Sequence, residues 1–499
     1  MNPLPMIQLT ERLEKLVKTI GTSTVTGIQK IPQSGSDRSY YRICTSRDTY
    51  MATVSPNIRE NETFLYFSGH FSKKGCPVPK VFAVSNDRSS YIQEDFGDVS
   101  LLSILEKQGQ VEQVFDLFKQ SLSELANMQI RGDEGLDYGR CITSQSFGKK
   151  AITSDLLYFK YYFLDTLKIP YDKEKLLDDF EALANYLCHV DHSYFMFRDF
   201  QSRNILVKDG NVRFIDYQGG MKGALQYDVA SLLWQAKAEL SDSWKGQLLE
   251  HYMSCVEAIF GKPLDRQRFI SQYNGYVLIR LLQVLGAYGF RGLFERKAHF
   301  LTSIPVALKN LRGFLAQSKT GISLPEFDRL LQLITADEVI DRFEPLKAGP
   351  SDRLVVTINS FSFLANGYPA DQSKNGGGFV FDCRGILNPG RIDQYKTQTG
   401  QQKPVIDFLE QETKMPEFLN SVYSIVDISV HDYLNRKFES LMINFGCTGG
   451  QHRSVYAAEA TARHLRNKFG VAVRINHLNA ANWVKEIPGN TRSAASIKE

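Results

Sequence analysis

The chain has little of what marks the specialised classes of protein. Its 499 residues contain no apolar run near the ~18 residues of a membrane span, and its first ten residues lack the charged start and apolar core of a signal peptide. Its seven cysteines are scattered from Cys44 to Cys447 without a C-x-x-C pair, which excludes a small disulfide scaffold. Neither sign of charge dominates, since 59 Lys and Arg against 55 Asp and Glu leave a formal net charge of +4, which neither requires nor excludes an anionic partner. We therefore expect a reduced, cytoplasmic protein that does not contact a membrane.

What is present is typical of a globular protein of several domains. Apolar residues make up 43% of the chain and charged residues 23%, and the length predicts two to four domains. Residues 1–95 predict a small lobe, with a helix over 7–20 and β-rich segments over 28–31, 40–44, 49–54, 81–84 and 91–93. Residues 96–341 predict a helical lobe, with helical spacing over 111–130, 176–189, 228–238 and 276–288. One stretch, 195–217, interrupts it with two β-like runs over 205–207 and 212–215.

The last part of the chain follows a different pattern. Prolines and glycine in residues 342–352 predict a linker, and residues 353–486 a smaller α/β domain. Its expected strands are 354–358, 378–382 and 441–446, and its expected helices are 404–412, 430–439 and 455–469. Residues 487–499 are a polar tail. The expected fold class is an α+β bilobal domain followed by a smaller α/β domain.

Three polar residues in the interrupting stretch predict phosphoryl transfer. Asp199 and Asn204 lie five residues apart, and the two β-like runs then return a second carboxylate, Asp216, to the same neighbourhood. Phosphoryl transfer needs a carboxylate that orients the acceptor and oxygen ligands for the metal that holds the nucleotide phosphates. The alternative is that the two aspartates are solvated turn residues, and each part of the pattern alone is weak.

Residues 1–340 resemble the aminoglycoside phosphotransferase and choline kinase superfamily, a branch of the protein-kinase-like fold. Within it they are most similar to the sugar kinases that phosphorylate N-acetylmuramate and N-acetylglucosamine at the anomeric hydroxyl. The resemblance implies that Asp199 is the catalytic base and that Asn204 and Asp216 hold Mg²⁺. It also implies that ATP is bound by a phosphate-covering turn and by the hinge between the lobes. The turn residues are Ser34, Gly35, Ser36, Asp37 and Arg38, and the hinge residues are Gln93, Glu94 and Asp95.

Two departures from the superfamily's pattern leave a pseudokinase open. The histidine that usually begins the catalytic motif is Phe197 here, and the strand over residues 50–54 carries no phosphate-binding lysine. The muramate-type kinases also lack an obvious lysine there, so the absence fits that subfamily. Glu62 on the next helix is the candidate for the usual ion-pair carboxylate, without a lysine to pair with. Asp228 resembles a residue that caps its helix and braces the catalytic loop.

A second constellation lies where the strand 441–445 runs into Gly446–Ser454 and then into an Ala-rich helix. A glycine-rich loop at a helix N-terminus favours an anion, and Arg453 adds a fork for phosphate oxygens. Cys447 and Arg453 also match the C-x5-R loop of cysteine phosphatases, in which a thiolate attacks phosphorus. That chemistry needs an acid as well, for which Asp427 and Asp432 are the candidates. A purely structural turn is the remaining alternative.

The wider context of this loop resembles the C-terminal domain of the RNase adapter protein RapZ. The match covers about residues 353–485 and includes the run from Phe381 to Gly390. In that family the domain senses glucosamine-6-phosphate and binds small RNAs. The resemblance implies an amino-sugar-phosphate pocket with Asp382, Arg384 and Asn388 near its rim and lined by Thr448, Gly449, Gly450, His452, Arg453 and Ser454. The family's N-terminal P-loop domain has no counterpart, because no G-x4-G-K-S/T occurs, so RNA binding is not safely inherited.

The sequence thus predicts a cytoplasmic, ATP- and Mg²⁺-dependent kinase that phosphorylates N-acetylmuramate or N-acetylglucosamine at the anomeric hydroxyl, in cell-wall sugar recycling. Its C-terminal domain would sense an amino-sugar phosphate. The opposing class is a regulator, in which a dead kinase serves as scaffold and the C-terminal domain binds an amino-sugar phosphate or RNA, or acts as a phosphatase.

Overall fold

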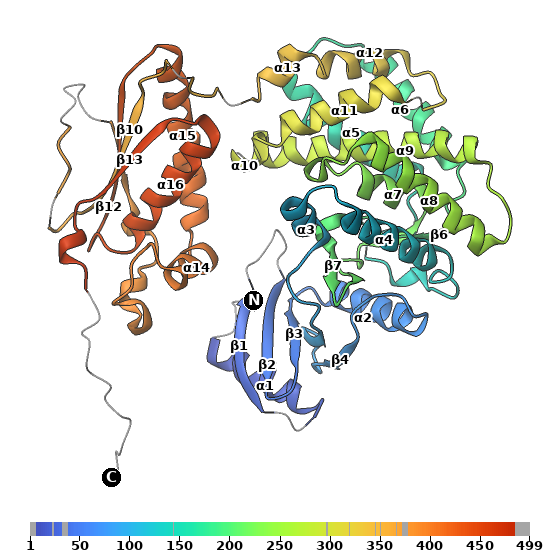
Figure 1. Cartoon of the computed structure of the whole chain (residues 1–499), viewed down its shortest axis with the longest axis horizontal. Helices are drawn as coiled ribbons and strands as arrows, with labels where there is room; N and C mark the ends of the chain where they lie inside the picture. The colour runs from blue at the N-terminus through green and yellow to red at the C-terminus, as the bar shows by residue number, and fades with distance from the viewer. Residues whose placement is uncertain are drawn as a thin grey trace. The chain divides into compact units, whose positions relative to one another are not determined.

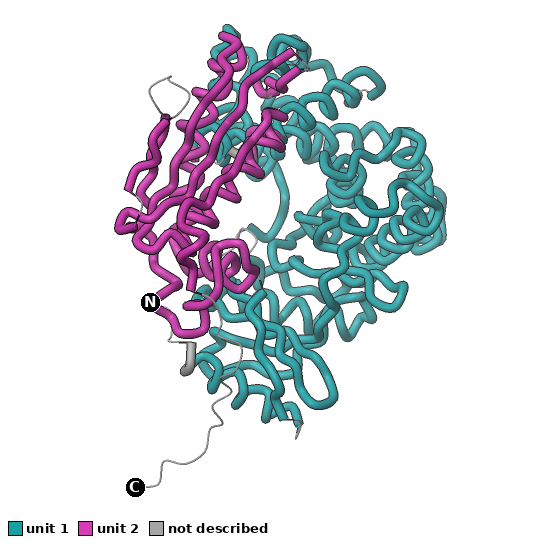
Figure 2. Tube along the Cα trace, turned by 60° about the vertical axis from the view of Figure 1, so that its left-hand side comes forward, with its two compact units in different colours: residues 1–294, 303–342 teal, residues 295–302, 343–499 magenta. Residues whose placement is uncertain are grey.

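The structure is a computed structural model that describes residues 6–21, 24–31, 38–142, 144–295, 298–318, 320–344, 346–349, 351–365, 367–371 and 378–484. The expected phosphate-covering residues Ser34–Asp37 and the polar tail lie outside these ranges. The chain divides into two compact units, residues 1–294 with 303–342 and residues 295–302 with 343–499 (Figure 2). The expected fold class is confirmed, since the first unit is bilobal and the second is a smaller α/β unit.

The small lobe of the first unit is an antiparallel sheet of five strands in the order β1-β2-β3-β5-β4 (Figure 1). The strands are β1 (Val25–Ile31), β2 (Ser39–Thr45), β3 (Thr49–Val54), β4 (Val81–Val84) and β5 (Ser90–Glu94). Helix α1 (Met6–Lys18) packs Leu9, Leu13 and Val17 against the strand residues Tyr41, Ile43, Ala52 and Ile92. Helix α2 (Ile58–Lys73) follows β3 and buries Phe64, Phe67 and Phe71.

The helical lobe surrounds one long apolar helix, α9 (Arg266–Tyr288). The others are α3 (Leu101–Gln108), α4 (Glu112–Ile130), α5 (Lys149–Tyr162), α6 (Lys173–Cys188), α7 (Leu225–Leu233), α8 (Asp242–Phe260), α11 (Ile304–Gln317), α12 (Pro325–Ile334) and α13 (Asp337–Asp341). In the described part of the chain, residues 266–294 are the one segment long and apolar enough to cross a membrane. They are a core helix, because α9 packs against α5, α7 and α11.

The predicted hairpin is present as β7 (Ile205–Lys208) and β8 (Asn211–Phe214), flanked by β6 (Tyr194–Met196) and β9 (Met221–Gly223). Its turn needs left-handed backbone at Asp209 and Gly210, with φ of 52° and 74°. The predicted helix over 228–238 was wrong at both ends, because α7 begins at Leu225 and ends at Leu233. It ends there because Gln235 adopts an extended backbone, from which its side-chain oxygen accepts hydrogen bonds from Ser202 in the loop between β6 and β7.

The second unit is a parallel sheet of four strands in the order β11-β12-β10-β13. These are β10 (Val355–Ser362), β11 (Gly378–Asp382), β12 (Ser440–Cys447) and β13 (Ala472–His477), and α16 (Arg453–Phe469) packs on the sheet. Helix α14 (Lys403–Gln411) precedes α15 (Met415–Asn435), and the short α10 (Ala298–Leu301) groups with this unit.

Two elements of the second unit differ from the sequence-based expectation. The predicted helix over 430–439 is the end of α15, which begins at Met415. Its buried stripe at Leu419, Val422, Val426, Val430 and Leu434 has regular three- and four-residue spacing, so the signal was available in the sequence. Strand β13 was not predicted.

Three asparagines fix the register of the parallel sheet. Asn359 on β10 donates to the side chain of Asn444 on β12 at 2.7 Å, and Asn476 on β13 donates to Asn359 at 2.9 Å. Asn444 in turn donates to the backbone oxygen of Phe379 on β11. A one-residue slip of any strand would leave these amides unpaired, which selects against it.

Candidate functional site

The loop that carries the expected base is braced by the buried Asp228. The buried carboxylate of Asp228 accepts hydrogen bonds from the backbone nitrogens of Phe197 at 2.7 Å and Arg198 at 3.0 Å, and from Gln129 Nε2 at 3.0 Å. Burial raises the pKa of Asp228 to about 7. The bracing role is confirmed, but the capping role was wrong, because the N-cap of α7 is Ala224 and Asp228 lies in the first turn.

Besides Asp209 in the hairpin turn, two non-glycine residues of the 197–217 stretch have left-handed backbone conformations, Arg198 with φ of 79° and Asp216 with φ of 70°. Such conformations cost free energy and persist where the surroundings hold them. Arg198 is held by a pair of contacts from Nη2 to the carboxylate of Asp155, at 3.1 and 3.2 Å. Strain of this kind at both ends of the Asp199–Asp216 segment points to a functional loop.

Phe197 stands where the superfamily has a histidine, and its packing explains why the loop tolerates the change. Its ring is buried and contacts the rings of Phe200, Phe214 and Tyr217 at centroid distances of 5.2, 6.2 and 6.1 Å. The side chain therefore supports the loop from inside the lobe and has no role in proton transfer.

Asp199 presents its carboxylate at the surface of the loop, with a side-chain exposed fraction of 36%. Oδ1 accepts from Gln201 Nε2 at 2.7 Å, and Oδ2 pairs with Arg203 at 3.2 Å. Arg280, a buried residue of α9, places Nη2 4.0 Å from Oδ1. Asp199 thus lies among three donor side chains at the exposed face of the loop.

Asn204 and Asp216 line one cavity of about 290 Å³ between the small lobe and the hairpin, together with the hinge residues Gln93, Glu94 and Asp95. Asn204 Nδ2 donates to the backbone oxygen of Asp199 at 2.9 Å, which ties the expected metal site to the expected base. Among the described residues no group of three or more His, Cys, Asp or Glu is placed so that it could hold a metal ion by itself. The pair nevertheless fits Mg²⁺, which binds through one or two protein oxygens and takes the rest from phosphates and water.

The hinge carboxylate of Asp95 has a structural role. Arg42 donates to both of its oxygens at 2.6 and 3.0 Å, and also pairs with Asp98. Lys208 donates to the backbone oxygen of Asp95 at 2.8 Å, which links the hinge to β7.

The ion-pair carboxylate of α2 is Glu60, and the assignment to Glu62 was wrong. Glu62 is half exposed and pairs at 3.6 Å with the exposed Arg88. Glu60 Oε1 lies 2.9 Å from Nη2 of Arg38, and the same nitrogen lies 3.1 Å from Asp216 Oδ1. Helical periodicity turns residues 60 and 62 to different sides of α2, so only Glu60 faces Arg38.

The loop of the second unit is tightly built around Cys447 at the end of β12. Its Sγ accepts from the backbone nitrogen of Gly450 at 3.2 Å and lies 3.1 Å from Ser454 Oγ. Gly450 has φ of 62°, and a side chain there would also press on Ser362 and Asn479. Gly446 has no room for a side chain beside the rings of Phe361 and Phe363.

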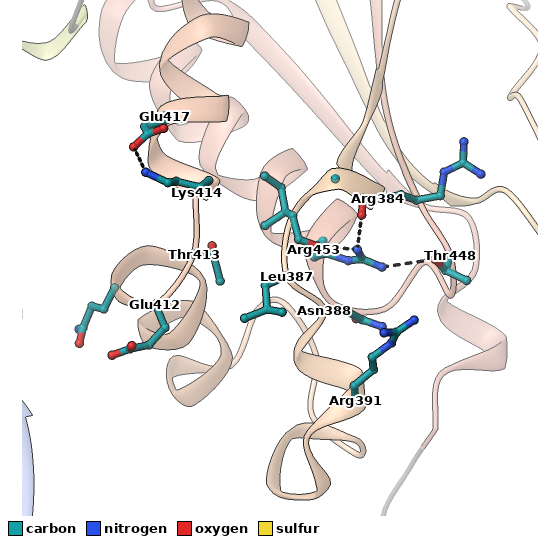
Figure 3. A pocket seen from close by; sticks show the side chains of 13 residues that line it. Arg384, Leu387, Asn388, Arg391, Glu412, Thr413, Lys414, Glu417, Thr448 and Arg453 are labelled. Atoms are coloured by element: carbon teal, nitrogen blue, oxygen red, sulfur yellow. Dashed lines mark hydrogen bonds and ion pairs between the residues drawn. The ribbon is translucent and has the colours of Figure 1, made fainter. Parts of the chain in front are cut away.

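A polar cavity of about 890 Å³ opens beside this loop (Figure 3). Of the six predicted ligand residues, Thr448 and Arg453 line it, as do the expected rim residues Arg384 and Asn388. Gly449, Gly450, His452 and Ser454 are not among its lining residues. His452 Nε2 donates to the backbone oxygen of Tyr395 at 2.8 Å, and burial lowers the pKa of His452.

Arg453 is held by the protein itself. Its Nη1 donates to the backbone oxygens of Arg384 at 3.1 Å and Ile386 at 2.7 Å, and its Nη2 to Thr448 Oγ1 at 3.3 Å. The guanidinium thus shapes the 384–388 turn. The sequence interpretation missed other charged residues of the cavity, which are Arg391, Glu412, Lys414 and Glu417.

The arrangement does not favour the phosphatase alternative. Cys447 is buried and does not line the cavity. Asp427 is paired with His464 and Lys468 at 2.8 and 2.7 Å, and Asp432 with Arg436 at 3.2 Å, so both candidate acids are engaged elsewhere.

Comparison with known proteins gives each unit a family. Residues 27–259 match the phosphotransferase enzyme family, and residues 354–481 match the RapZ C-terminal domain. A nucleotide-binding protein of Xanthomonas campestris pv. campestris is 36% identical over 252 residues, which cover 46% of this chain and 86% of that protein. One of Glaesserella parasuis serovar 5 is 35% identical over 154 residues, 30% of this chain and 51% of that protein.

The chain spans about half or less of the length of the first curated relatives it matches, between 38% and 51%. Among solved structures, the choline kinase of Cryptosporidium parvum Iowa II is 13% identical, covers 66% of this chain and 100% of that chain, and has a TM-score of 0.45.

Proposed function

The chain carries a phosphotransferase-family domain fused to a RapZ C-terminal domain, and from that premise we propose that it is an ATP- and Mg²⁺-dependent amino-sugar kinase. The acceptor is the anomeric hydroxyl of N-acetylmuramate or N-acetylglucosamine, and the product is a sugar 1-phosphate for cell-wall sugar recycling in the cytoplasm. The kinase comprises residues 1–341 and the second domain residues 353–486.

One observation carries the kinase proposal: the hydrogen bond from Asn204 to Asp199 joins the proposed base to the cavity that Asn204 and Asp216 share with the hinge. Bound Mg²⁺ would be held by Asn204 and Asp216 and would neutralise charge on the phosphates. Asp199 accepts the proton of the sugar hydroxyl as the sugar oxygen bonds to the terminal phosphorus of ATP. The bond from that phosphorus to the bridging oxygen breaks, and ADP is the leaving group. Asp228, through Phe197 and Arg198, keeps that loop in place.

The test is a coupled ADP-release assay of the full chain across amino sugars with and without a free anomeric hydroxyl. We expect turnover with N-acetylmuramate or N-acetylglucosamine, and none with their methyl glycosides, in which the anomeric oxygen is blocked. Turnover with the methyl glycosides would move the transfer to another hydroxyl. Absence of turnover with every sugar, in a chain that still binds RNA or sugar phosphate, would favour the pseudokinase regulator.

For the second unit we propose binding of an amino-sugar phosphate without hydrolysis. The support is the distribution of charge in the 890 Å³ cavity, which has Arg384, Arg391 and Arg453 on one side, and Glu412 with the Lys414–Glu417 ion pair on the other (Figure 3). Such a cavity complements a ligand with a phosphate at one end and an ammonium group at the other. RNA contact has no comparable support in the described residues.

Calorimetry on the full chain with glucosamine 6-phosphate tests this proposal. The controls are glucosamine, which has the amino group without the phosphate, and inorganic phosphate, which has the phosphate without the amino sugar. Arg391→Gln should weaken binding about tenfold, because a charged hydrogen bond is lost. The matched variant Arg436→Gln on α15, whose residue lies outside the cavity lining, should bind like wild type. Equal binding of glucosamine 6-phosphate by both variants would contradict the assignment.

A further inference from the structure

The cavity of the first unit has more carboxylates than cations among its described lining residues, and the proposed function does not explain how such a cavity binds a nucleotide. Its described lining residues include the carboxylates Glu94, Asp95, Asp98 and Asp216, and only one cationic side chain, that of Arg38. Arg42 is also close to the cavity, but its guanidinium is already paired with both Asp95 and Asp98. A nucleotide carries several negative charges on its phosphates, so a cavity of this composition needs a protein cation directed at them.

The strand that usually supplies this cation cannot do so here. Residues 50–54 of β3 are Tyr, Met, Ala, Thr and Val, and Thr53 is fully buried. In the β2–β3 ladder Ser39 pairs with Val54 and Tyr40 with Thr53. Arg38, the residue before β2, therefore reaches the cavity beside the end of β3.

We propose that Arg38 is the phosphate-binding cation of this chain, supplied from the start of β2 and anchored by Glu60 of α2. The proposal rests on the kinase function. Arg38 is 6% exposed, and Nη2 contacts Glu60 Oε1 at 2.9 Å and Asp216 Oδ1 at 3.1 Å. A guanidinium has five N–H groups in a fixed fork, so it can keep an anchoring carboxylate and still donate to phosphate oxygens.

A second side chain stabilises the same cluster. Gln218 Nε2 donates to Asp216 Oδ1 at 2.8 Å and to Glu60 Oε1 at 3.4 Å, and Gln218 is also buried. The two carboxylates are thus joined by two donors, one of them cationic. Phosphate bound to Arg38 would be held next to Asp216, the proposed metal ligand, with Glu60 as the counter-charge that keeps the guanidinium oriented.

The experiment measures nucleotide affinity by calorimetry on the full chain, with Mg²⁺ and either ADP or adenosine. Arg38→Gln should weaken ADP binding about ten- to hundredfold, because charge-assisted contacts to phosphate are lost. Adenosine should bind as in wild type, because it has no phosphates. Arg38→Lys should recover part of the ADP affinity.

The neighbouring glutamates supply a matched pair. Glu60→Gln should weaken ADP binding by removing the anchor, and Glu62→Gln should not, since Glu62 pairs with the exposed Arg88. Unchanged ADP affinity in Arg38→Gln, with wild type binding ADP, would overturn the role of Arg38 and leave the kinase proposal intact. Equal loss of ADP and adenosine would also overturn it, because it would show a purely structural role. If the wild-type chain binds neither ADP nor adenosine, the kinase proposal itself is wrong.

Discussion

At the residue scale, the proposed transfer depends on the carboxylate of Asp199. Asp199→Asn should lower kcat by about 10²–10⁴-fold, because the amide cannot accept the sugar proton. ATP affinity and the fold should change little, since the side chain is partly exposed and lies outside the cavity proposed to bind the nucleotide. Steady-state kinetics with a coupled ADP assay measures this. The control is Asp209→Asn in the hairpin turn, where Asn tolerates the left-handed backbone. Near-wild-type turnover in Asp199→Asn would remove Asp199 as the base.

Asp228 predicts a pH dependence of stability. Burial raises its pKa to about 7, whereas the unfolded carboxyl titrates near 3.9. Between these values the folded chain binds more protons at this group, so its contribution to the free energy of unfolding is fully present below about pH 4. It falls by up to ~1.4 kcal/mol per pH unit until about pH 7.

Urea unfolding of wild type and Asp228→Asn from pH 4 to 8 tests this contribution. The difference in stability, wild type minus variant, should decrease as the pH rises towards 7 and level off above it. The subtraction cancels the other titrating groups. A difference that stays constant, or grows with pH, would show that the hydrogen bonds from Phe197, Arg198 and Gln129 outweigh burial.

At the scale of the element, the β7–β8 hairpin brings Asp216 back to Asn204. Asp216→Ala should shift the Mg²⁺ dependence of activity to higher concentration, or abolish activity, because it removes the carboxylate that would hold Mg²⁺ under this proposal. A Mg²⁺ titration of turnover at saturating ATP measures the shift. Gln218→Ala is the informative neighbour: it removes one donor to Asp216 and keeps the carboxylate, so its shift should be smaller. An unchanged Mg²⁺ curve in Asp216→Ala would place the metal elsewhere.

The loop between β12 and α16 predicts different outcomes for its two reactive-looking residues. Cys447→Ser should bind glucosamine 6-phosphate nearly as wild type, because the thiol does not line the cavity. Arg453→Ala should lose binding together with stability, since it leaves the backbone oxygens of Arg384 and Ile386 without their donor. Calorimetry and thermal unfolding of each variant separate the two effects. Aryl phosphate hydrolysis that disappears in Cys447→Ser would instead support the phosphatase.

At the scale of the whole molecule, two units with separate cores predict two ligand-specific transitions. The second unit has its own apolar core, centred on β10, β12, α15 and α16. ADP with Mg²⁺ should stabilise only the first unit, and glucosamine 6-phosphate only the second. At a hundredfold excess over Kd, each ligand should add about 2.7 kcal/mol to the free energy of unfolding of its unit and so raise that unit's transition temperature. Differential scanning calorimetry measures both. A shift of both transitions by one ligand would mean that the two sites are energetically coupled.

The sequence by itself determined the local parts of this protein. Helical apolar spacing predicted α4, and short β-rich runs bounded by turn residues predicted β3, β4, β11 and the β7–β8 hairpin, because these signals lie in consecutive residues. The order Asp199, Asn204, Asp216 predicted that the three side chains lie in one neighbourhood, because a hairpin between Asn204 and Asp216 returns the chain to where it started. The family match of each domain agrees with the resemblance drawn from those motifs.

Only the tertiary structure decided which side chains meet across elements. Glu60 and Glu62 are two residues apart and chemically alike, and the packing of α2 alone decides which one reaches Arg38. Arg453 has the spacing of a phosphate ligand, yet the approach of the 384–388 turn gives its guanidinium to two backbone oxygens. The charged residues Arg391 and Glu412 carry no motif, and they become cavity partners because distant segments fold beside β12. Spacing along a chain sets what is near in sequence, whereas contacts between elements depend on packing that no single period encodes.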